Sequence, residues 1–170
     1  LTEDTGKARI VRNANCGSHG LDSLLHYNKF TNQVFTLTSR LKAVDGFDAD
    51  FPAMQDYDTW VRLVARFGPG FKIAAPSYIW HTGHEQNRIS GSPVKRLSAL
   101  KLFLTKHQAL LTPAHSNSLE IMRLKMAGEK LGLWRCLQLI NRGNWRSALS
   151  LYANTSAKTV KNLIDWLRFR

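Results

Sequence analysis

The sequence predicts an α/β segment over residues 1–90, followed by an all-α tail over residues 91–170. Short β-branched and aromatic runs alternate with helical patterns in the first part, whereas only helical patterns occur in the second. The charge changes at the same place. Residues 1–90 carry 10 Lys and Arg against 9 Asp and Glu, and residues 91–170 carry 14 against 3. A domain boundary is therefore predicted near residue 90.

In the first part, alternating or β-branched runs predict strands, and apolar residues at helical spacing predict helices. The predicted strands are residues 7–12, 33–38 and 71–80. The predicted helices are residues 21–30, 40–44 (with Ser39 as N-cap) and 54–67. Residues 1–6 are expected to form a turn and residues 13–20 a loop. The run Gly68-Pro69-Gly70 predicts where the third helix ends.

The helix predicted over residues 54–67 is the most informative element. Its apolar residues share one face, which we expect to be buried: Tyr57, Trp60, Val61, Val64 and Phe67. Asp56 and Asp58 lie in the first turn, where unpaired N–H groups and the positive end of the helix dipole favour carboxylates. Such carboxylates commonly act as caps. One that reaches a substrate hydroxyl can instead accept its proton.

In the second part, Ser92-Pro93 and Thr112-Pro113 are helix start signals, because each places an N-cap residue before a proline at the first helical position. The predicted helices are residues 93–107, 113–130, 133–140, 144–153 and 156–168. Short helices joined by short connections predict antiparallel packing.

The composition narrows the function classes. Hydrophobic residues make up 44% of the chain and no run of 18 apolar residues occurs, so no transmembrane helix is predicted. Cys16 and Cys136 lack the spacing of a disulfide framework or a metal site, which favours a cytoplasmic protein. The basic second half predicts an anionic partner, either phospholipid or nucleic acid.

Aromatic and basic residues occur together in the helical tail. Residues 158–170 combine Lys and Arg with Trp166 and Phe169, and the pairs Trp134-Arg135 and Trp145-Arg146 repeat this composition. It is typical of a helix lying on an anionic membrane surface, here the inner face of the cytoplasmic membrane. The alternative is a terminal helix that docks on the bundle. Nucleic acid is a weaker partner, because no helix-turn-helix spacing is present.

Two runs of residues resemble the second half of a family 2 glycosyltransferase. The first is Phe-Thr-Leu-Thr-Ser-Arg-Leu-Lys-Ala-Val-Asp-Gly-Phe-Asp over residues 35–48, and the second is Gln-Asp-Tyr-Asp-Thr-Trp over residues 55–60. In that family a Gly-Phe-Asp turn precedes a helix that opens with Glu-Asp-Tyr-Asp-Leu-Trp. Gln55 and Thr59 depart from this pattern. The resemblance covers residues 21–90 and implies the C-terminal part of a GT-A nucleotide-diphospho-sugar transferase fold.

The resemblance implies roles for single residues. Asp56 would be the general base, and Gln55, Asp58 and Trp60 would form the acceptor-side wall. His81 would complete a divalent metal site (Mn²⁺ or Mg²⁺) or contact the diphosphate, with His84 as a competing candidate, and Arg88 would pair with phosphate oxygens. From the residues alone, the pattern favours a core position for Trp60, a hydrogen-bonded histidine for His81 and a solvent-facing side chain for Arg88.

The implied reaction is inverting transfer of a sugar from a nucleotide-sugar donor to a hydroxyl of a glycan or lipid-linked acceptor, in bacterial cell-surface polysaccharide or lipopolysaccharide synthesis. The family's Asp-x-Asp motif does not occur in its usual context before residue 40. We therefore expect a fragment of a longer enzyme that is inactive alone. The competing hypotheses are a non-catalytic basic helical module that binds nucleic acid or an anionic membrane, and a membrane-peripheral adaptor.

Overall fold

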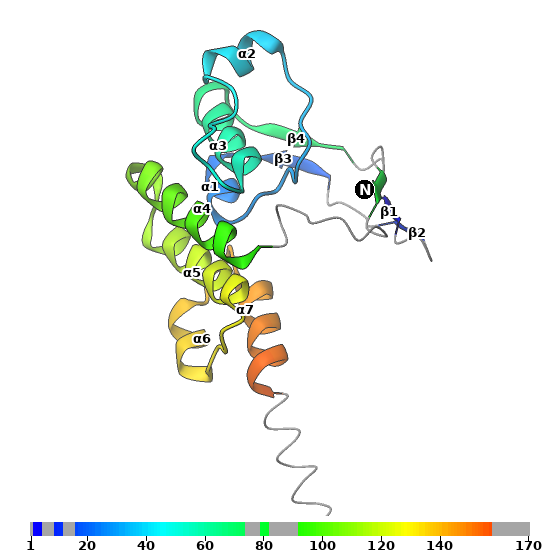
Figure 1. Cartoon of the computed structure of the whole chain (residues 1–170). Helices are drawn as coiled ribbons and strands as arrows, with labels where there is room; N and C mark the ends of the chain where they lie inside the picture. The colour runs from blue at the N-terminus through cyan, green and yellow to red at the C-terminus, as the bar shows by residue number, and fades with distance from the viewer. Residues whose placement is uncertain (1, 5–8, 12–15, 74–78, 82–91, 158–170) are drawn as a thin grey trace, which may run out of the picture.

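The computed structural model describes residues 2–4, 9–11, 16–73, 79–81 and 92–157, and these are mostly helical (Figure 1). The helices are α1 (Leu21–His26), α2 (Thr38–Ala43), α3 (Gln55–Phe67), α4 (Pro93–Lys106), η2 (Gln108–Leu110), α5 (Pro113–Ala127), α6 (Leu133–Leu139), α7 (Trp145–Tyr152) and η3 (Ala153–Ala157). The strands are β1 (Thr2–Asp4), β2 (Arg9–Val11), β3 (Gly17–His19), β4 (Gly70–Lys72) and β5 (Ile79–His81).

The strands form two small sheets. In the order β2-β1-β5, β1 pairs antiparallel with β2 and parallel with β5, which places Asp4 opposite His81. In the second sheet β3 pairs antiparallel with β4, with His19 opposite Gly70 and Gly17 opposite Lys72. The predicted turn over residues 1–6 and the predicted loop over residues 13–20 were therefore wrong where they contain β1 and β3.

The strand predicted over residues 33–38 is absent. Residues 33–37 have no regular structure, and Thr38 begins α2 instead. The side chain of Phe35 is fully exposed and Leu37 is mostly exposed. β-branched and aromatic residues favour a strand only when a partner strand and a packing surface are available, and this segment has neither.

The predicted helix over residues 54–67 is confirmed as α3. Its N-cap, Met54, has a left-handed backbone (φ 64°), and Gly68 ends the helix with φ 88°. The expected apolar face is buried except for Phe67. That ring lies at the last turn, where the guanidinium groups of Arg40 and Arg66 cover it at 5.3 and 5.6 Å from its centroid.

Both predicted helix starts in the second part are confirmed. Ser92 Oγ accepts a hydrogen bond from the Lys95 amide, and Thr112 forms a reciprocal capping box with His115. The helix α5 ends at Ala127, three residues before the predicted end, and its C-cap Gly128 adopts the left-handed conformation (φ 68°). The helices α6 and α7 match the predicted ranges within two residues. The helix predicted over 156–168 lies almost entirely outside the described residues.

One apolar core joins both halves of the chain. Leu24, Tyr57 and Val61 from α1 and α3 pack in the same buried cluster as Phe103 from α4 and Leu119 from α5. A second, smaller cluster joins the end of α5 to α6 and α7. Figure 1 shows α4 and α5 side by side, with α1 and α3 on one side of them and α6 and α7 on the other. The boundary predicted at residue 90 therefore does not divide the packing.

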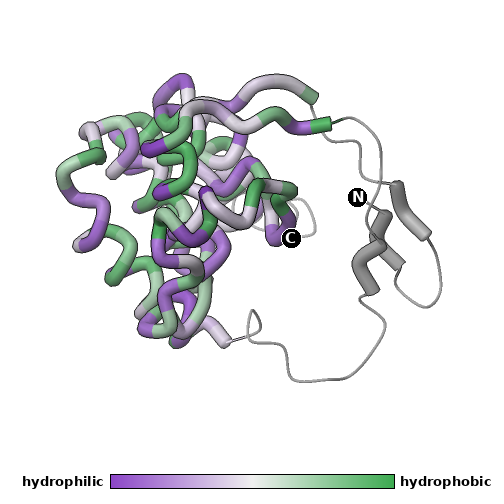
Figure 2. The backbone as a smooth tube through the Cα atoms, turned by 90° about the horizontal axis from the view of Figure 1, so that it is seen from above, coloured by the Kyte–Doolittle hydropathy of each residue, from purple (hydrophilic) through white to green (hydrophobic). Residues whose placement is uncertain are grey.

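Hydrophobic and hydrophilic residues are interleaved along the described helices (Figure 2). Among these helices, none combines the length and the apolar character that crossing a bilayer requires.

Candidate functional site

The first turn of α3 presents Asp56, which is half-buried. Burial raises the pKa of this carboxyl above its ordinary value, although hydrogen bonds from the backbone amides of Tyr57 and Asp56 and from the Asn28 side chain oppose the shift. Asn28 Nδ2 lies 3.3 Å from Asp56 Oδ2. A carboxylate with a raised pKa is a stronger proton acceptor than an ordinary aspartate.

The support of Asp56 is the turn over residues 28–31, which follows α1. Within the turn, Asn28 Nδ2 donates to the Thr31 carbonyl at 2.9 Å, and the Phe30 amide donates to Asn28 Oδ1 at 3.1 Å. Trp60 Nε1 donates to the same Thr31 carbonyl at 2.9 Å. These bonds fasten the turn to the first two turns of α3, so the Asp56 carboxylate is held by a fixed frame.

Asp58, two residues further, has a different environment. Its side chain is fully buried, and it accepts hydrogen bonds from Arg62 Nη2 (2.7 Å), Lys106 Nζ (3.0 Å) and His107 Nε2 (2.9 Å). Burial alone would raise its pKa, but these donors lower it to about 2. The carboxylate is thus an internal ion-pair centre joining α3 to the end of α4. A fully buried carboxylate cannot contact an acceptor, so Asp58 does not fit the predicted place in the acceptor-side wall.

Trp60 also occupies a core position. Its side chain is only 4% exposed, and its ring meets the Phe47 ring edge-on at 5.7 Å between centroids. This burial fits the core position expected from the residues alone and does not fit a place in the acceptor-side wall. Gln55, the first residue of α3, is half-buried beside Asp56, and its substrate-binding role stays a prediction.

The predicted metal and phosphate contacts lie at the edge of the described structure. His81 is the last residue of β5 and stands opposite Asp4 of β1, while His84 and Arg88 lie outside the described residues. The strand that contains Asp4 was not predicted, because residues 1–6 were expected to form a turn.

An open pocket of about 700 Å³ lies between α2, α3 and the end of α4. Its charged lining residues are Asp45, Asp48, Arg62, Arg66 and Lys106. Lys106 Nζ pairs with Asp48 at 2.6 Å, and the two arginines donate to the carbonyls of Ala43 and Val44 at the end of α2. Asp56 is not among the residues that line this pocket.

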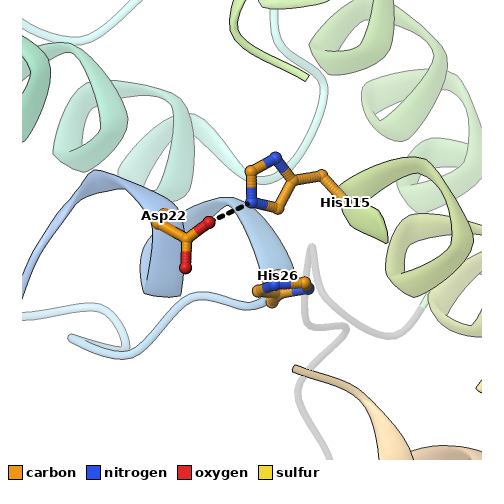
Figure 3. A group of neighbouring side chains, drawn as sticks. All are labelled: Asp22, His26 and His115. Carbon is orange, nitrogen blue, oxygen red and sulfur yellow. Dashed lines mark hydrogen bonds and ion pairs between the residues drawn. The ribbon is translucent and has the colours of Figure 1, made fainter. Parts of the chain in front are cut away.

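A cluster of Asp22, His26 and His115 joins α1 to α5 (Figure 3). One ligand atom from each residue lies within 4.8 Å of the other two. His115 Nε2 lies 3.0 Å from Asp22 Oδ1, and the two imidazole rings meet edge-on at 4.6 Å. A carboxylate and two imidazoles at this separation are a ligand set that divalent transition metals accept.

The hydrogen bonds around the cluster decide which nitrogens are available. The Thr112 amide donates to His115 Nδ1 at 3.1 Å, so in neutral His115 the proton is on Nε2, which donates to Asp22. Ser118 Oγ donates to the Ala114 carbonyl, and it therefore accepts the Nδ1 proton of His26. A metal would need a lone pair on Nε2 of His115, but that nitrogen carries the proton donated to Asp22. The cluster therefore fits a set of hydrogen bonds that join α1 to α5 better than a metal site.

The chain is similar to a protein of Escherichia coli (strain K12) named "Putative colanic acid biosynthesis glycosyl transferase WcaA". The two are 32% identical over 144 residues, which is 84% of this chain and 45% of the relative. The chain thus spans less than half the length of that relative. No protein-family model and no solved structure matches the chain. The match supports a glycosyltransferase relationship for the aligned region.

Proposed function

We propose that this chain carries the acceptor side of an inverting family 2 glycosyltransferase and that Asp56 is its general base. The observation that carries the proposal is the contrast between two carboxylates in one helical turn. Asp58 is fully buried and bonded to three cationic or imidazole side chains. Asp56 is half-buried with a raised pKa, and its one side-chain partner among the described residues is Asn28. The likeness to a protein named as a glycosyl transferase supports the same reaction class.

In the proposed reaction, an acceptor hydroxyl gives its proton to the Asp56 carboxylate while its oxygen attacks the anomeric carbon of a nucleotide sugar. The bond between that carbon and the diphosphate oxygen breaks, and the nucleoside diphosphate leaves with the bonding electrons. A single in-line displacement of this kind inverts the anomeric configuration. The fixed turn over residues 28–31 helps, because a base acts efficiently only when its geometry is held.

A divalent cation, Mn²⁺ or Mg²⁺, belongs to this proposal, because it would neutralise the charge that develops on the departing diphosphate. His81 is the residue that would hold it, since imidazole nitrogen is a donor that Mn²⁺ accepts. Arg88 and Gln55 are proposed to contact the phosphates and the acceptor, respectively.

The proposed acceptor is a glycan or a lipid-linked sugar used in cell-surface polysaccharide assembly. This proposal is supported by the printed name of the relative, which refers to colanic acid biosynthesis. A GT-A type fold, of which residues 1–90 would be the C-terminal part, remains part of the same proposal.

The test is a transfer assay on the longest form of the protein that the gene encodes, with nucleotide sugars as donors and cell-surface glycan as acceptor. Replacing a general base typically lowers the rate about 100- to 10,000-fold, so Asp56→Asn is expected to do the same. Asp50→Asn is the matched control, because Asp50 is an exposed acid in the preceding turn. Transfer by Asp56→Asn close to the wild-type rate would refute the assignment.

A second candidate function is docking on an anionic membrane surface. The helices α6 and α7 expose large apolar side chains, with Trp134 79% exposed and Trp145 47% exposed. Exposed basic residues accompany them: Lys130, Arg135, Arg142 and Arg146. The Arg146 guanidinium lies 4.9 Å from the Trp145 ring centroid. Exposed indoles next to basic groups suit the headgroup region of an anionic bilayer.

Sedimentation with vesicles tests this candidate. Binding is expected to vesicles rich in phosphatidylglycerol, to weaken with salt, and to fall in the double variant Trp134→Ser/Trp145→Ser. Equal partition into neutral vesicles would contradict an electrostatic docking surface. Binding to duplex DNA with a steep salt dependence would assign the basic tail to nucleic acid instead.

A further inference from the structure

Three basic side chains from separate segments meet at the turn over residues 28–31. His19 ends β3, Lys72 ends β4, and Lys29 lies within the turn itself. All three side chains are half-buried, although the Nε2 atom of His19 is itself buried.

Direct contacts hold this arrangement together. Lys72 Nζ donates to the Lys29 carbonyl at 3.0 Å, which ties the end of β4 to the turn. The His19 ring packs edge-on against the Phe30 ring at 6.0 Å. Gly70 lies so close to Phe30 that a Cβ at this position would be 2.6 Å from the ring, and no other residue type fits there without movement. The β3–β4 pair therefore rests directly on the turn.

Within the described part of the chain, no acidic side chain pairs with the two lysines of the cluster. Among the residues that the structure describes, neither lysine forms an ion pair, and buried His19 Nε2 has no hydrogen-bond partner. The neighbours that affect these groups are themselves basic. Burial, Lys29 and Lys72 lower the pKa of His19, and burial and Lys72 lower the pKa of Lys29. Grouping like charges without a counter-ion costs free energy, which a bound anion would recover.

We propose that His19, Lys29 and Lys72 form a binding site for the phosphate or diphosphate group of a ligand. The ammonium groups of Lys29 and Lys72 offer several donors to phosphate oxygens, and a protonated His19 would add a positive charge beside them. The Lys29 ammonium lies 4.8 Å from the Tyr27 ring centroid, and this contact restricts the positions that the ammonium can take. A cationic site with an unpartnered imidazole nitrogen is the complement of a compact polyanion.

The same turn supports the Asp56 carboxylate through Asn28. A phosphate group bound at the cluster would therefore be placed on the same frame as the proposed base. The site itself does not depend on the transfer reaction, because it rests on contacts and charges of residues outside that chemistry. Its phosphate could belong to a soluble nucleotide or to a lipid headgroup, and the experiment separates these sources.

The experiment measures binding of inorganic pyrophosphate to the 170-residue chain by titration calorimetry and by NMR of the His19 imidazole. Saturable binding is expected, together with a rise in the pKa of His19 as the anion binds. Lys29→Met/Lys72→Met is expected to weaken binding about tenfold or more, since a hydrogen bond to a charged group is removed at each position. Lys125→Met is the matched control, because Lys125 is an exposed lysine on α5.

Two further arms identify the source of the phosphate. Tighter binding of a nucleoside diphosphate than of pyrophosphate assigns the site to a nucleotide, and binding only to vesicles that contain phosphatidic acid assigns it to a lipid. His19→Gln keeps a polar side chain and tests the imidazole without removing either lysine. The proposal is overturned if none of the three probes binds, or if the control loses as much affinity as the double lysine variant.

Discussion

The side-chain amide of Asn28 donates to the Asp56 carboxylate at 3.3 Å, which connects the turn after α1 to the first turn of α3. The other atoms of the same amide are also engaged, by the Thr31 carbonyl and the Phe30 amide. Asn28 is thus a positioning residue. The hydrogen bonds within residues 28–31 fix the orientation of its side chain, and that side chain fixes the orientation of the Asp56 carboxylate. Of the interactions that set the pKa of Asp56, this hydrogen bond is the one that comes from a distant part of the sequence.

Replacing Asn28 is therefore expected to change the titration of Asp56. In Asn28→Ala the carboxylate loses a donor that favours its charged form, so its pKa should rise. In Asn28→Asp the rise should be larger, because a second negative charge is placed within hydrogen-bond distance. The measurement is a pH titration of the Asp side-chain carboxyl carbons by NMR.

Asn117→Ala is a suitable control, because Asn117 is a half-buried asparagine, like Asn28, whose amide donates to the Gln138 carbonyl instead. It should leave the titration of Asp56 unchanged. An unchanged or lower pKa of Asp56 in both Asn28 variants would show that the carboxylate is held by other groups.

The raised pKa of Asp56 also predicts how it affects stability. The folded state binds the proton more tightly than the unfolded state, so the stability linked to this group is present at low pH and is lost as pH rises through the folded pKa. At pH 7 the ionised carboxylate is therefore a destabilising group. Asp56→Asn should raise the urea midpoint at pH 7 and have little effect near pH 3, measured by circular dichroism. A lower midpoint at pH 7 would mean that the helix N-terminus gains more from the charge than burial costs.

Local signals were sufficient to predict the helical part of this fold. Ser92-Pro93 and Thr112-Pro113 begin helices because the capping side chain and the proline act within one turn. The apolar spacing of α3 predicted its buried face for the same reason. The strands depended on pairing between distant residues: β3 is three residues long and contains a glycine, so only its pairing with β4 defines it. The run 33–38 has strand propensity but no partner.

The site shows the same limit. Asp56 and Asp58 are equivalent by sequence spacing, since both lie in the first turn of α3. The residues that distinguish them lie far away in the sequence: Lys106 and His107 are 48 and 49 residues after Asp58, and Asn28 is 28 residues before Asp56. Which carboxylate is internal and which faces outward is therefore decided by tertiary packing of α4 against α3.

Removal of the Asp58 carboxylate should be strongly destabilising. In Asp58→Ala the buried His107 side chain loses its carboxylate acceptor. The side chains of Arg62 and Lys106 each lose one of their acceptors. Breaking a buried ion pair on one side costs about 3–5 kcal/mol of unfolding free energy. Urea denaturation measures the loss. Asp50→Ala, a change at an exposed acid, should stay within about 0.5 kcal/mol of wild type, and an equally small loss in Asp58→Ala would contradict the role of this centre.

The acid stability of the protein should reflect Asp58 as well. Its folded pKa of about 2 is below the ordinary value of 3.8, so its contribution is fully present above pH 4 and is lost as pH falls towards 2. Wild-type stability should therefore decrease over this range, and the decrease should be smaller in Asp58→Asn. Equal slopes for the two proteins between pH 4 and 2 would assign acid unfolding to other carboxyls.

The contact between Gly143 and His26 predicts how the α6–α7 connection is held against α1. A Cβ at position 143 would lie 2.3 Å from atoms of the His26 imidazole, and that ring is buried and bonded to Ser118 Oγ at 2.7 Å. The ring is not free to move aside, so Gly143→Ala should destabilise the protein by about 1–3 kcal/mol, as overpacking of a filled site does. Gly132→Ala is the control, because a Cβ there meets nothing within 4 Å.

A double-mutant cycle separates the clash from the intrinsic effect of losing a glycine. If the imidazole is the obstacle, His26→Ala provides the space that the methyl group needs, and the two substitutions should be coupled by about 1 kcal/mol or more. The Gly143→Ala change would then cost less in the His26→Ala background than in wild type, measured as urea midpoints of all four proteins. Strictly additive losses would place the strain in the backbone of the connection, because the removed ring would then play no part in it.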